Sequence, residues 1–277
     1  RSHAAAPAVP GVQGQRGGMV KTDGLRRQLL ERRVTLGTWI QVGHPAVAEV
    51  LANAGFDWIA ADMEHTDIDN AGFAALARGM HGRGALPLAR VRENDTLAIR
   101  QVLDLGAAGV LVPLVHTADD AERAVRAAKY PPRGVRGFCF SRMNDWGADF
   151  DAYAARADDD VAVVVMIESQ EGVENIEAIL AVDGVDAAFI GPYDLSGSCG
   201  VPGETQHETV QVGSRRVRDA CRSAGKSAGM HVVIPTEAAL RQAIDDGFTF
   251  VALGVDTVFL DRGAREALAR AAADRAP

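Results

Sequence analysis

The chain has 277 residues, 47% of them hydrophobic, which is enough to bury one large core, and this length fits a single α/β barrel as well as two average domains. The formal net charge is −8 and no run of Lys or Arg occurs, so nucleic acids and membrane surfaces are not expected as partners. Three widely spaced cysteines indicate neither a disulfide framework nor a zinc cluster, and no apolar run reaches the roughly 18–20 residues of a membrane span, so we expect a cytoplasmic protein.

The first 18 residues, RSHAAAPAVPGVQGQRGG, are rich in Ala, Pro and Gly and lack the charged-then-apolar order of a signal peptide. We interpret residues 1–18 as a disordered or vector-derived leader and Met19 as the natural start, with a genuine flexible arm as the alternative. Residues 19–277 are expected to form one domain.

Strand-like and helix-like segments alternate through the first half of that domain. After an amphipathic helix over 21–33, the expected strands are 34–41, 56–62, 85–91 and 109–113, and the helices that follow them are 45–55, 70–81, 96–106 and 118–129. Gly55 is a candidate C-cap and Asp95 a candidate N-cap.

A long irregular stretch, 130–150, interrupts the alternation, and loops of this length are usually functional or disordered. The expected strands then are 161–167, 187–190, 226–232 and 248–254, with helices over 171–180, 208–224, 236–246 and 257–273. Eight strands alternating with eight helices predict a TIM barrel. A doubly wound open sheet is the alternative, although no GxGxxG follows the first strand.

Two carboxylates follow neighbouring strands, Glu168 after 161–167 and Asp194 after 187–190. A right-handed crossover would make these strands parallel, which brings both carboxylates to the end of the sheet where α/β proteins keep their chemistry. Two carboxylates with few soft ligands nearby suit a hard cation such as Mg²⁺ or Mn²⁺. For either residue taken alone, ion pairing or helix capping is the more common explanation, and the pair at successive strand ends makes the structural and metal-binding interpretations equally good.

The segment IGPYDLSGSCG contains a turn at Gly191 and Pro192 that precedes a possible helix start. Such a turn can present the backbone N–H groups of Tyr193 and Asp194 to an anion, so a small carboxylate could bind there beside the cation. A plain connection between a helix and a strand fits the same string.

Further candidates come from the second and third strands. His65, which follows Glu64, could act as a general base if an acid such as Asp104 held it. Arg90 at a strand end could stabilise an enolate oxygen, with Arg92 as a rival for that role. A surface histidine and a salt bridge at the barrel rim are the structural alternatives.

Several strings, in this order, closely resemble the HpcH/HpaI aldolase family, and the resemblance runs from about Met19 to the C-terminus. The strings are GTWIQVGHPAVAEVLANAGFDWIAADMEHTDID, ARVREND, IRQVLDLGAAGVLVP, KYPPRGVRG, IES and GVDAAFIGPYDLSGSCGVPG. This family includes metal-dependent 4-hydroxy-2-oxoheptanedioate and 2-keto-3-deoxy sugar-acid aldolases, and macrophomate synthase is a relative.

The resemblance implies a TIM barrel whose dimers exchange the C-terminal helix and assemble into hexamers as trimers of dimers, with active sites near subunit contacts. By motif match, Glu168 and Asp194 would be metal ligands, His65 the acid/base oriented by Asp104, and Arg90 the arginine that holds the keto or enolate oxygen. The pocket would be lined by Trp39, Asp62, Met166, Gly191, Pro192 and Tyr193, with the amides of Tyr193 and Asp194 on the substrate carboxylate.

The chain departs from the family pattern in two places. Met166 stands where many members have a polar residue near the metal, so the surroundings of the metal are expected to differ. The string SRMNDWGAD also differs from the versions typical of the family, which bears on the aldehyde side of the pocket.

The resemblance implies a class II aldolase, a carbon–carbon lyase that cleaves a 4-hydroxy-2-oxo acid to pyruvate and an aldehyde through a metal-bound enolate. The cofactor would be Mg²⁺ or Mn²⁺, with Co²⁺ as a further candidate. Three alternatives are an oxaloacetate decarboxylase or macrophomate-synthase-like lyase, an enzyme of the citrate-lyase type that uses coenzyme A, and a non-catalytic barrel that binds a carboxylate.

Overall fold

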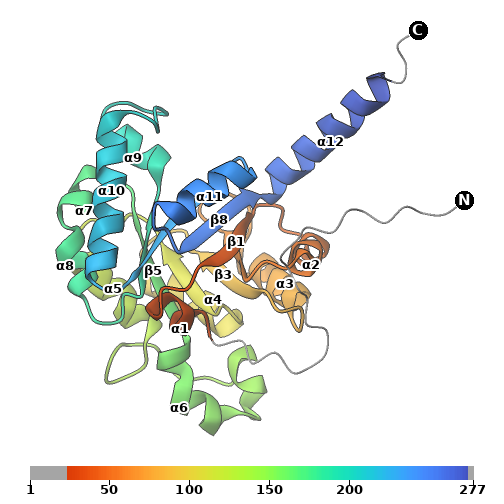
Figure 1. The fold of residues 1–277 in the computed structure, drawn as a ribbon. Helices are drawn as coiled ribbons and strands as arrows, with labels where there is room; N and C mark the ends of the chain where they lie inside the picture. The colour runs from red at the N-terminus through yellow and green to blue at the C-terminus, as the bar shows by residue number, and fades with distance from the viewer. Residues whose placement is uncertain (1–23, 274–277) are drawn as a thin grey trace, which may run out of the picture.

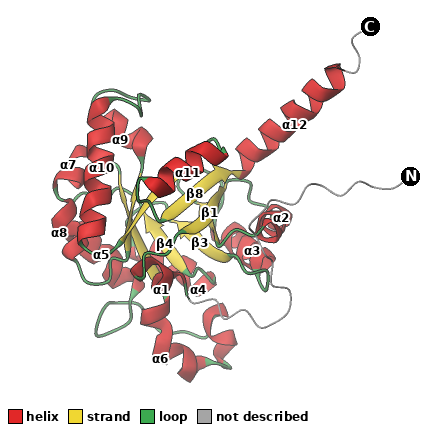
Figure 2. Ribbon diagram, viewed as in Figure 1, coloured by secondary structure: helices red, strands yellow, loops and turns green. Residues whose placement is uncertain are grey.

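The computed structural model describes residues 24–273 and contains a closed barrel of parallel strands arranged in sequence order (Figures 1 and 2). The strands are β1 (Thr35–Ile40), β2 (Trp58–Asp62), β3 (Leu86–Arg90), β4 (Gly109–Val112), β5 (Ala162–Ile167), β6 (Ala187–Ile190), β7 (Ser227–Val232) and β8 (Phe250–Val255). Because β8 pairs with β1, the predicted single-domain TIM barrel is confirmed and the open sheet is wrong. The predicted leader lies outside the described residues.

Helices surround the barrel, and no helix of the described part of the chain is long and apolar enough to cross a membrane. They are α1 (Leu25–Leu30), α2 (Pro45–Ala54), α3 (Asn70–Met80), α4 (Thr96–Leu105), α5 (Ala118–Ala128), η1 (Arg142–Gly147), α6 (Phe150–Asp160), α7 (Gln170–Glu174), α8 (Ile176–Ala181), α9 (Pro192–Ser198), α10 (Glu208–Ser223), α11 (Glu237–Asp245) and α12 (Asp256–Ala273). The expected caps form: Gly55 adopts φ 99° after α2, and the Asp95 carboxylate accepts from the backbone N–H groups of Leu97 and Ala98.

Large aromatic side chains fill the barrel interior. Trp58 stacks on Phe250 with ring centroids 4.2 Å apart, and Phe189 packs edge-on against both Phe250 and Trp39. Gly37 makes room for this layer, because a Cβ atom there would lie 1.9 Å from the Trp58 ring. The interior is therefore a packed core and not a channel.

The N-terminal end of the barrel is closed by α1. Leu25 and Leu29 are buried against the interior core, and the Ser227 hydroxyl donates to the Leu29 carbonyl at 2.8 Å. Arg26 pairs with the buried Asp186 at 2.9 Å. A ligand must therefore approach the interior from the other end, where the strands terminate.

Three segments differ from the sequence prediction. The stretch expected to be irregular contains η1 and leads into α6, which escaped prediction because it buries only Tyr153 and Ala157 and so has little apolar periodicity. The helix expected over 171–180 is broken at Asn175, whose side-chain amide donates to the carbonyl of His116. The turn at 191–192 opens directly into α9, where the sequence indicated only a possible helix start and no helix range.

The C-terminal helix α12 leaves the barrel and projects into solvent (Figure 1). Its first residues contact β1 and β8, whereas Leu260 and Leu268 are 72% and 71% exposed. In a TIM barrel the helix after a strand normally packs back onto the sheet. Here the chain's own last helix leaves that outer face uncovered.

Candidate active site

A cavity of about 140 Å³ opens at the C-terminal ends of the strands. Its lining residues come from the C-terminal parts of seven strands, β1 to β3 and β5 to β8, and from the start of α9: Trp39, Gln41, Asp62, Arg90, Met166, Glu168, Phe189, Ile190, Gly191, Pro192, Tyr193, Asp194, His231 and Val255. This is the end at which TIM-barrel enzymes carry their active sites.

Arg90 is fixed in the cavity wall by an ion pair across adjacent strands. Asp62 ends β2 directly opposite Arg90 at the end of β3, and its carboxylate accepts from Arg90 Nη2 at 2.7 Å and from Nε at 3.1 Å. Burial opposes the charge on Asp62, but the Arg90 guanidinium together with the hydrogen bonds from His65 and Gln41 holds the pKa of Asp62 below its usual value. The guanidinium also lies over the Trp39 ring at 4.8 Å, which leaves Nη1 without a protein partner among the described residues.

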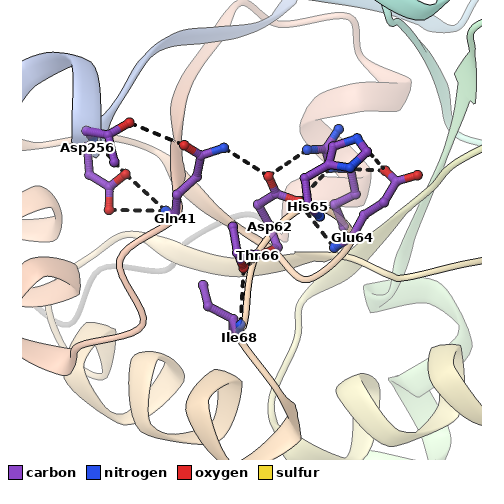
Figure 3. A network of polar contacts seen from close by, with 9 residues as sticks. Gln41, Asp62, Glu64, His65, Thr66, Ile68 and Asp256 are labelled. Atoms are coloured by element: carbon purple, nitrogen blue, oxygen red, sulfur yellow. Dashed lines mark hydrogen bonds and ion pairs between the residues drawn. The ribbon is translucent and has the colours of Figure 1, made fainter.

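A chain of hydrogen bonds holds Asp62 in turn (Figure 3). The Asp256 carboxylate accepts from the backbone N–H groups of Gln41 and Val42, and the Gln41 amide donates to Asp62 at 3.1 Å. Asp62 also accepts from the backbone of Glu64 and His65. Contacts from the residues that directly follow β1, β2 and β8 thus fix the orientation of Arg90.

Glu168, at the end of β5, is 5% exposed and depends on two special backbone positions. Its Oε2 accepts from the N–H of Leu114 at 3.0 Å, and Leu114 adopts φ 55°, which costs a non-glycine residue of the order of 1 kcal/mol. Gly191 permits the close approach on the other side, since a Cβ atom there would lie 2.6 Å from Glu168 Oε1. The carboxylate therefore sits against backbone on both sides.

Three carboxylates crowd this part of the site. Burial, together with the charges of Glu64 and Asp194, raises the pKa of Glu168 from 4.5 to about 7 even though the Leu114 N–H opposes the shift. Burial also raises the pKa of Glu64, with Arg90 opposing and with Asp62 and Asp194 adding to the rise. Carboxylates whose pKa values are raised by burial and by neighbouring negative charges form a site that a cation would stabilise.

The donor chemistry of the site fits a hard divalent cation. Glu64 Oε2 is buried without a hydrogen-bond donor and has only ion-pair neighbours, Arg90 Nε at 3.4 Å and His65 Nε2 at 3.7 Å. Glu168 Oε1 also has no donor among the described residues, since the Leu114 bond uses Oε2. In the part of the chain that the structure describes, no three His, Cys, Asp or Glu side chains are spaced to hold a metal, so water and substrate would complete the coordination shell.

Most of the predicted pocket residues meet in this cavity: Trp39, Asp62, Arg90, Met166, Glu168, Gly191, Pro192, Tyr193 and Asp194 all line it. His65 lies beside it, with a side chain 56% exposed and close to Glu64. The rival arginine, Arg92, donates to the carbonyl of Ile68 and does not line the cavity.

Asp104 is not brought to His65 within one chain. It lies in the last turn of α4, which runs back toward the N-terminal ends of the strands, whereas His65 follows the C-terminal end of β2. Its carboxylate accepts from the buried Arg136 at 2.7 Å. The string 141–149, expected beside the aldehyde, also does not line the cavity and packs against α4.

Six cavity or neighbouring residues had no role assigned from the sequence: Gln41, Glu64, Phe189, Ile190, His231 and Val255. Glu64 stands between two predicted site residues in the string DMEH, which is the signal that marks it. Phe189 and Val255 are ordinary apolar strand residues, and Gln41 and His231 are single polar residues near strand ends, so only the closed barrel brings them together.

Comparison with known proteins gives a consistent result. A model of the HpcH/HpaI aldolase/citrate lyase family matches residues 35–261. The 5-keto-4-deoxy-D-glucarate aldolase of Escherichia coli O139:H28 is 38% identical over 229 residues, which cover 82% of this chain and 88% of the relative.

Solved structures agree with the fold. An HpcH/HpaI aldolase/citrate lyase family protein from Burkholderia cenocepacia J2315 is 34% identical, with a TM-score of 0.85 over 89% of this chain and 98% of that one. Macrophomate synthase superposes with a TM-score of 0.80 over 91% of this chain and 90% of its own, and at 23% identity this likeness shows the fold alone.

Replacing Glu168 with Gln should stabilise the metal-free protein at pH 8, because the native state then holds one fewer buried, repelled charge. The pKa of Glu168 in the folded protein, about 7, lies above the ordinary 4.5, so the native state binds an extra proton between these values. The cost of this group is therefore absent near pH 4 and complete above pH 7. Urea denaturation in EDTA should show a gain of about 1–3 kcal/mol at pH 8 and none near pH 4.

The exposed Glu204 supplies the control, since Glu204→Gln should change the free energy of unfolding little at either pH. An equal effect of Glu168→Gln at both pH values would contradict the carboxylate crowding.

Proposed function

The chain belongs to the HpcH/HpaI aldolase/citrate lyase family, and from this premise we propose that it is a divalent-metal-dependent lyase that cleaves a 4-hydroxy-2-oxo acid to pyruvate and an aldehyde. The observation that carries the proposal is the meeting of Glu168 and Asp194 in one small cavity with the fixed guanidinium of Arg90, while Glu64 lies beside that cavity. Carboxylates that can hold a metal ion, together with the positive charge of Arg90, suit a substrate on which the negative charge of an enolate develops.

Glu168 and Asp194 would hold the cation, with Glu64 nearby as a buried negative charge. When bound, Mg²⁺ or Mn²⁺, or Co²⁺ as a further candidate, supplies Lewis-acid polarisation of the keto group. Met166 lies beside Glu168 in the cavity wall, and its apolar side chain adds no ligand there.

Arg90 stabilises the enolate oxygen. Its Nε and Nη2 are occupied by Asp62, so Nη1 is the donor available to the keto oxygen. Because the guanidinium is already oriented by Asp62 and Trp39, it needs little rearrangement as charge develops on that oxygen.

The backbone at the start of α9 receives the substrate carboxylate. The N–H groups of Tyr193 and Asp194 lie in the first helical turn, where the helix itself supplies no acceptor. Gly191 and Pro192 bring this turn to the cavity wall. The 2-oxo acid is thereby oriented with its keto oxygen toward Arg90.

His65 moves the proton of the C4 hydroxyl through a bridging water. Loss of that proton breaks the C3–C4 bond, the aldehyde leaves, and protonation of C3 gives the methyl group of pyruvate. Asp104 orients His65 from a second copy of the chain, because its own copy holds it at the other end of the barrel.

The same assembly accounts for the projecting helix. The exposed Leu260 and Leu268 of α12 would cover the outer face of a neighbouring barrel, which exchanges its own helix in return (Figure 1). We propose a hexamer built as a trimer of such dimers, in the cytoplasm, with small-molecule 2-oxo acids and aldehydes as its reaction partners.

Substituting the proposed ligands should remove metal-dependent turnover. With Mn²⁺ present, Glu168→Gln and Asp194→Asn should each lower kcat for pyruvate release from a 4-hydroxy-2-oxo acid by at least about 100-fold. Asp183→Asn, at a side chain that is 95% exposed, is the matched control and should keep the wild-type rate. Wild-type release of CO₂ from oxaloacetate faster than any aldol cleavage would instead favour a decarboxylase.

Mixed oligomers test the shared site. His65→Ala and Asp104→Ala should each inactivate the enzyme, but co-expression should restore about a quarter of the sites, because some contacts then pair an intact His65 with an intact Asp104. Activity is measured on oligomers purified through different tags on the two variants. Mixed oligomers as inactive as either parent would contradict an Asp104 supplied by a second copy.

A further inference from the structure

Gln41 lines the active-site cavity, and the proposed mechanism gives it no role of its own. It directly follows β1, and its side-chain Nε2 donates to Asp62 Oδ2 at 3.1 Å. The same Asp62 oxygen lies 2.7 Å from Arg90 Nη2. One hydrogen bond therefore separates Gln41 from the ion pair that orients the Arg90 guanidinium.

The hydrogen bonds of Gln41 determine which way its amide faces. A carboxylate can only accept, so the NH₂ group lies toward Asp62 and Oε1 points away from it. Oε1 accepts from the hydroxyl of Thr257 at 3.2 Å, and Thr257 is the second residue of α12. The amide thus links the first turn of α12, through Asp62, to Arg90.

The backbone at Gln41 is held by the same helical turn (Figure 3). Asp256, the first residue of α12, is 6% exposed, and its carboxylate accepts from the N–H groups of Gln41 at 3.0 Å and Val42 at 2.8 Å. It also accepts from the N–H of Thr257. Charge-assisted bonds of this kind are strong, so the first two residues of α12 position both the main chain and the side chain of Gln41.

The two oxygens of Asp62 depend on different donors. Oδ1 accepts from the backbone of Glu64 and His65 and from Arg90 Nε. Among the described residues, Oδ2 meets only Arg90 Nη2 and the Gln41 amide. Without Gln41, this side of the carboxylate would be held by the guanidinium alone, and the two groups could shift together. A displaced donor stabilises a developing charge less well.

We propose that Gln41 is a positioning residue for Arg90, and that its amide carries the placement of the first turn of α12 to the group that stabilises the enolate oxygen. This inference rests on the proposed function. The helix that would cover a second barrel then begins with the residues that support Arg90, so assembly and the chemical step share one hydrogen-bonded network.

The test follows exchange of the pyruvate methyl protons in D₂O with Mg²⁺ by proton NMR and compares kcat and KM between variants. Gln41→Met keeps the side-chain length without a donor or acceptor. It should lower kcat roughly tenfold and change KM for pyruvate by less than about twofold, because Arg90 acts mainly as the enolate forms. Gln41→Glu keeps the shape but sets an acceptor against Asp62, so it should lower kcat further.

A double-mutant cycle tests the link to α12. Thr257→Val removes the hydroxyl that holds Gln41 Oε1, so it should lower kcat about threefold alone and cause no further loss in the Gln41→Met background. Gln242→Met is the matched control, at an exposed glutamine of α11 whose amide donates to Asp246, and it should keep the wild-type kcat. Thr257→Val alone still tests the link if the Gln41 variants do not fold.

The outcomes separate this inference from the function on which it rests. A wild-type kcat in Gln41→Met, or a loss that falls on KM instead of kcat, would overturn the positioning role while exchange by the wild-type protein continues. Equal losses from Thr257→Val in both backgrounds would overturn the link to α12. No metal-dependent exchange by the wild-type protein would instead contradict the proposed function.

Discussion

The crowding of carboxylates at one end of the barrel is the constraint on which the rest of the site depends. Burial raises the pKa values of Glu168 and Glu64, and neighbouring charges add to the rise, those of Glu64 and Asp194 for Glu168 and those of Asp62 and Asp194 for Glu64. Asp62 itself keeps a lowered pKa because it is paired with Arg90 and hydrogen-bonded by Gln41. The site thus holds one carboxylate, Asp62, whose charge is neutralised by Arg90 and which orients that guanidinium. The other carboxylates are left to be neutralised by a bound metal ion.

This arrangement is unfavourable for the metal-free fold and must be maintained by the surrounding structure. Leu114 holds a left-handed backbone conformation to present its N–H to Glu168, and Gly191 leaves room for the carboxylate. The opposite end of the barrel has no such conflict, since α1 closes it and Arg26 satisfies the buried Asp186. Packing at the N-terminal end of the barrel therefore stabilises the fold, whereas the active site at the C-terminal end contains the strained backbone and the unneutralised charges.

The alternation of apolar strands and amphipathic helices predicted parallel strands covered by helices, and eight such units favoured the barrel, but only the pairing of β8 with β1 excluded the open sheet. Position at strand ends predicted the meeting of Glu168 with Asp194, and the family resemblance selected Arg90 over Arg92. Periodicity did not reveal α6, which buries few residues, or the break at Asn175, which depends on a distant carbonyl. The position of His231 in the cavity wall could not be predicted from the sequence, since its partner Gly254 and its neighbour Trp39 are on other strands.

The central claim is that this site stabilises the enolate of a 2-oxo acid, and proton NMR of pyruvate in D₂O tests it most directly. The measurement follows the methyl signal with Mg²⁺ or Mn²⁺ and again after addition of EDTA, so no aldehyde has to be identified. We predict loss of the methyl signal that requires the metal and stops with EDTA. A methyl signal that persists with either metal would show that pyruvate does not form an enolate here and would contradict the proposed function.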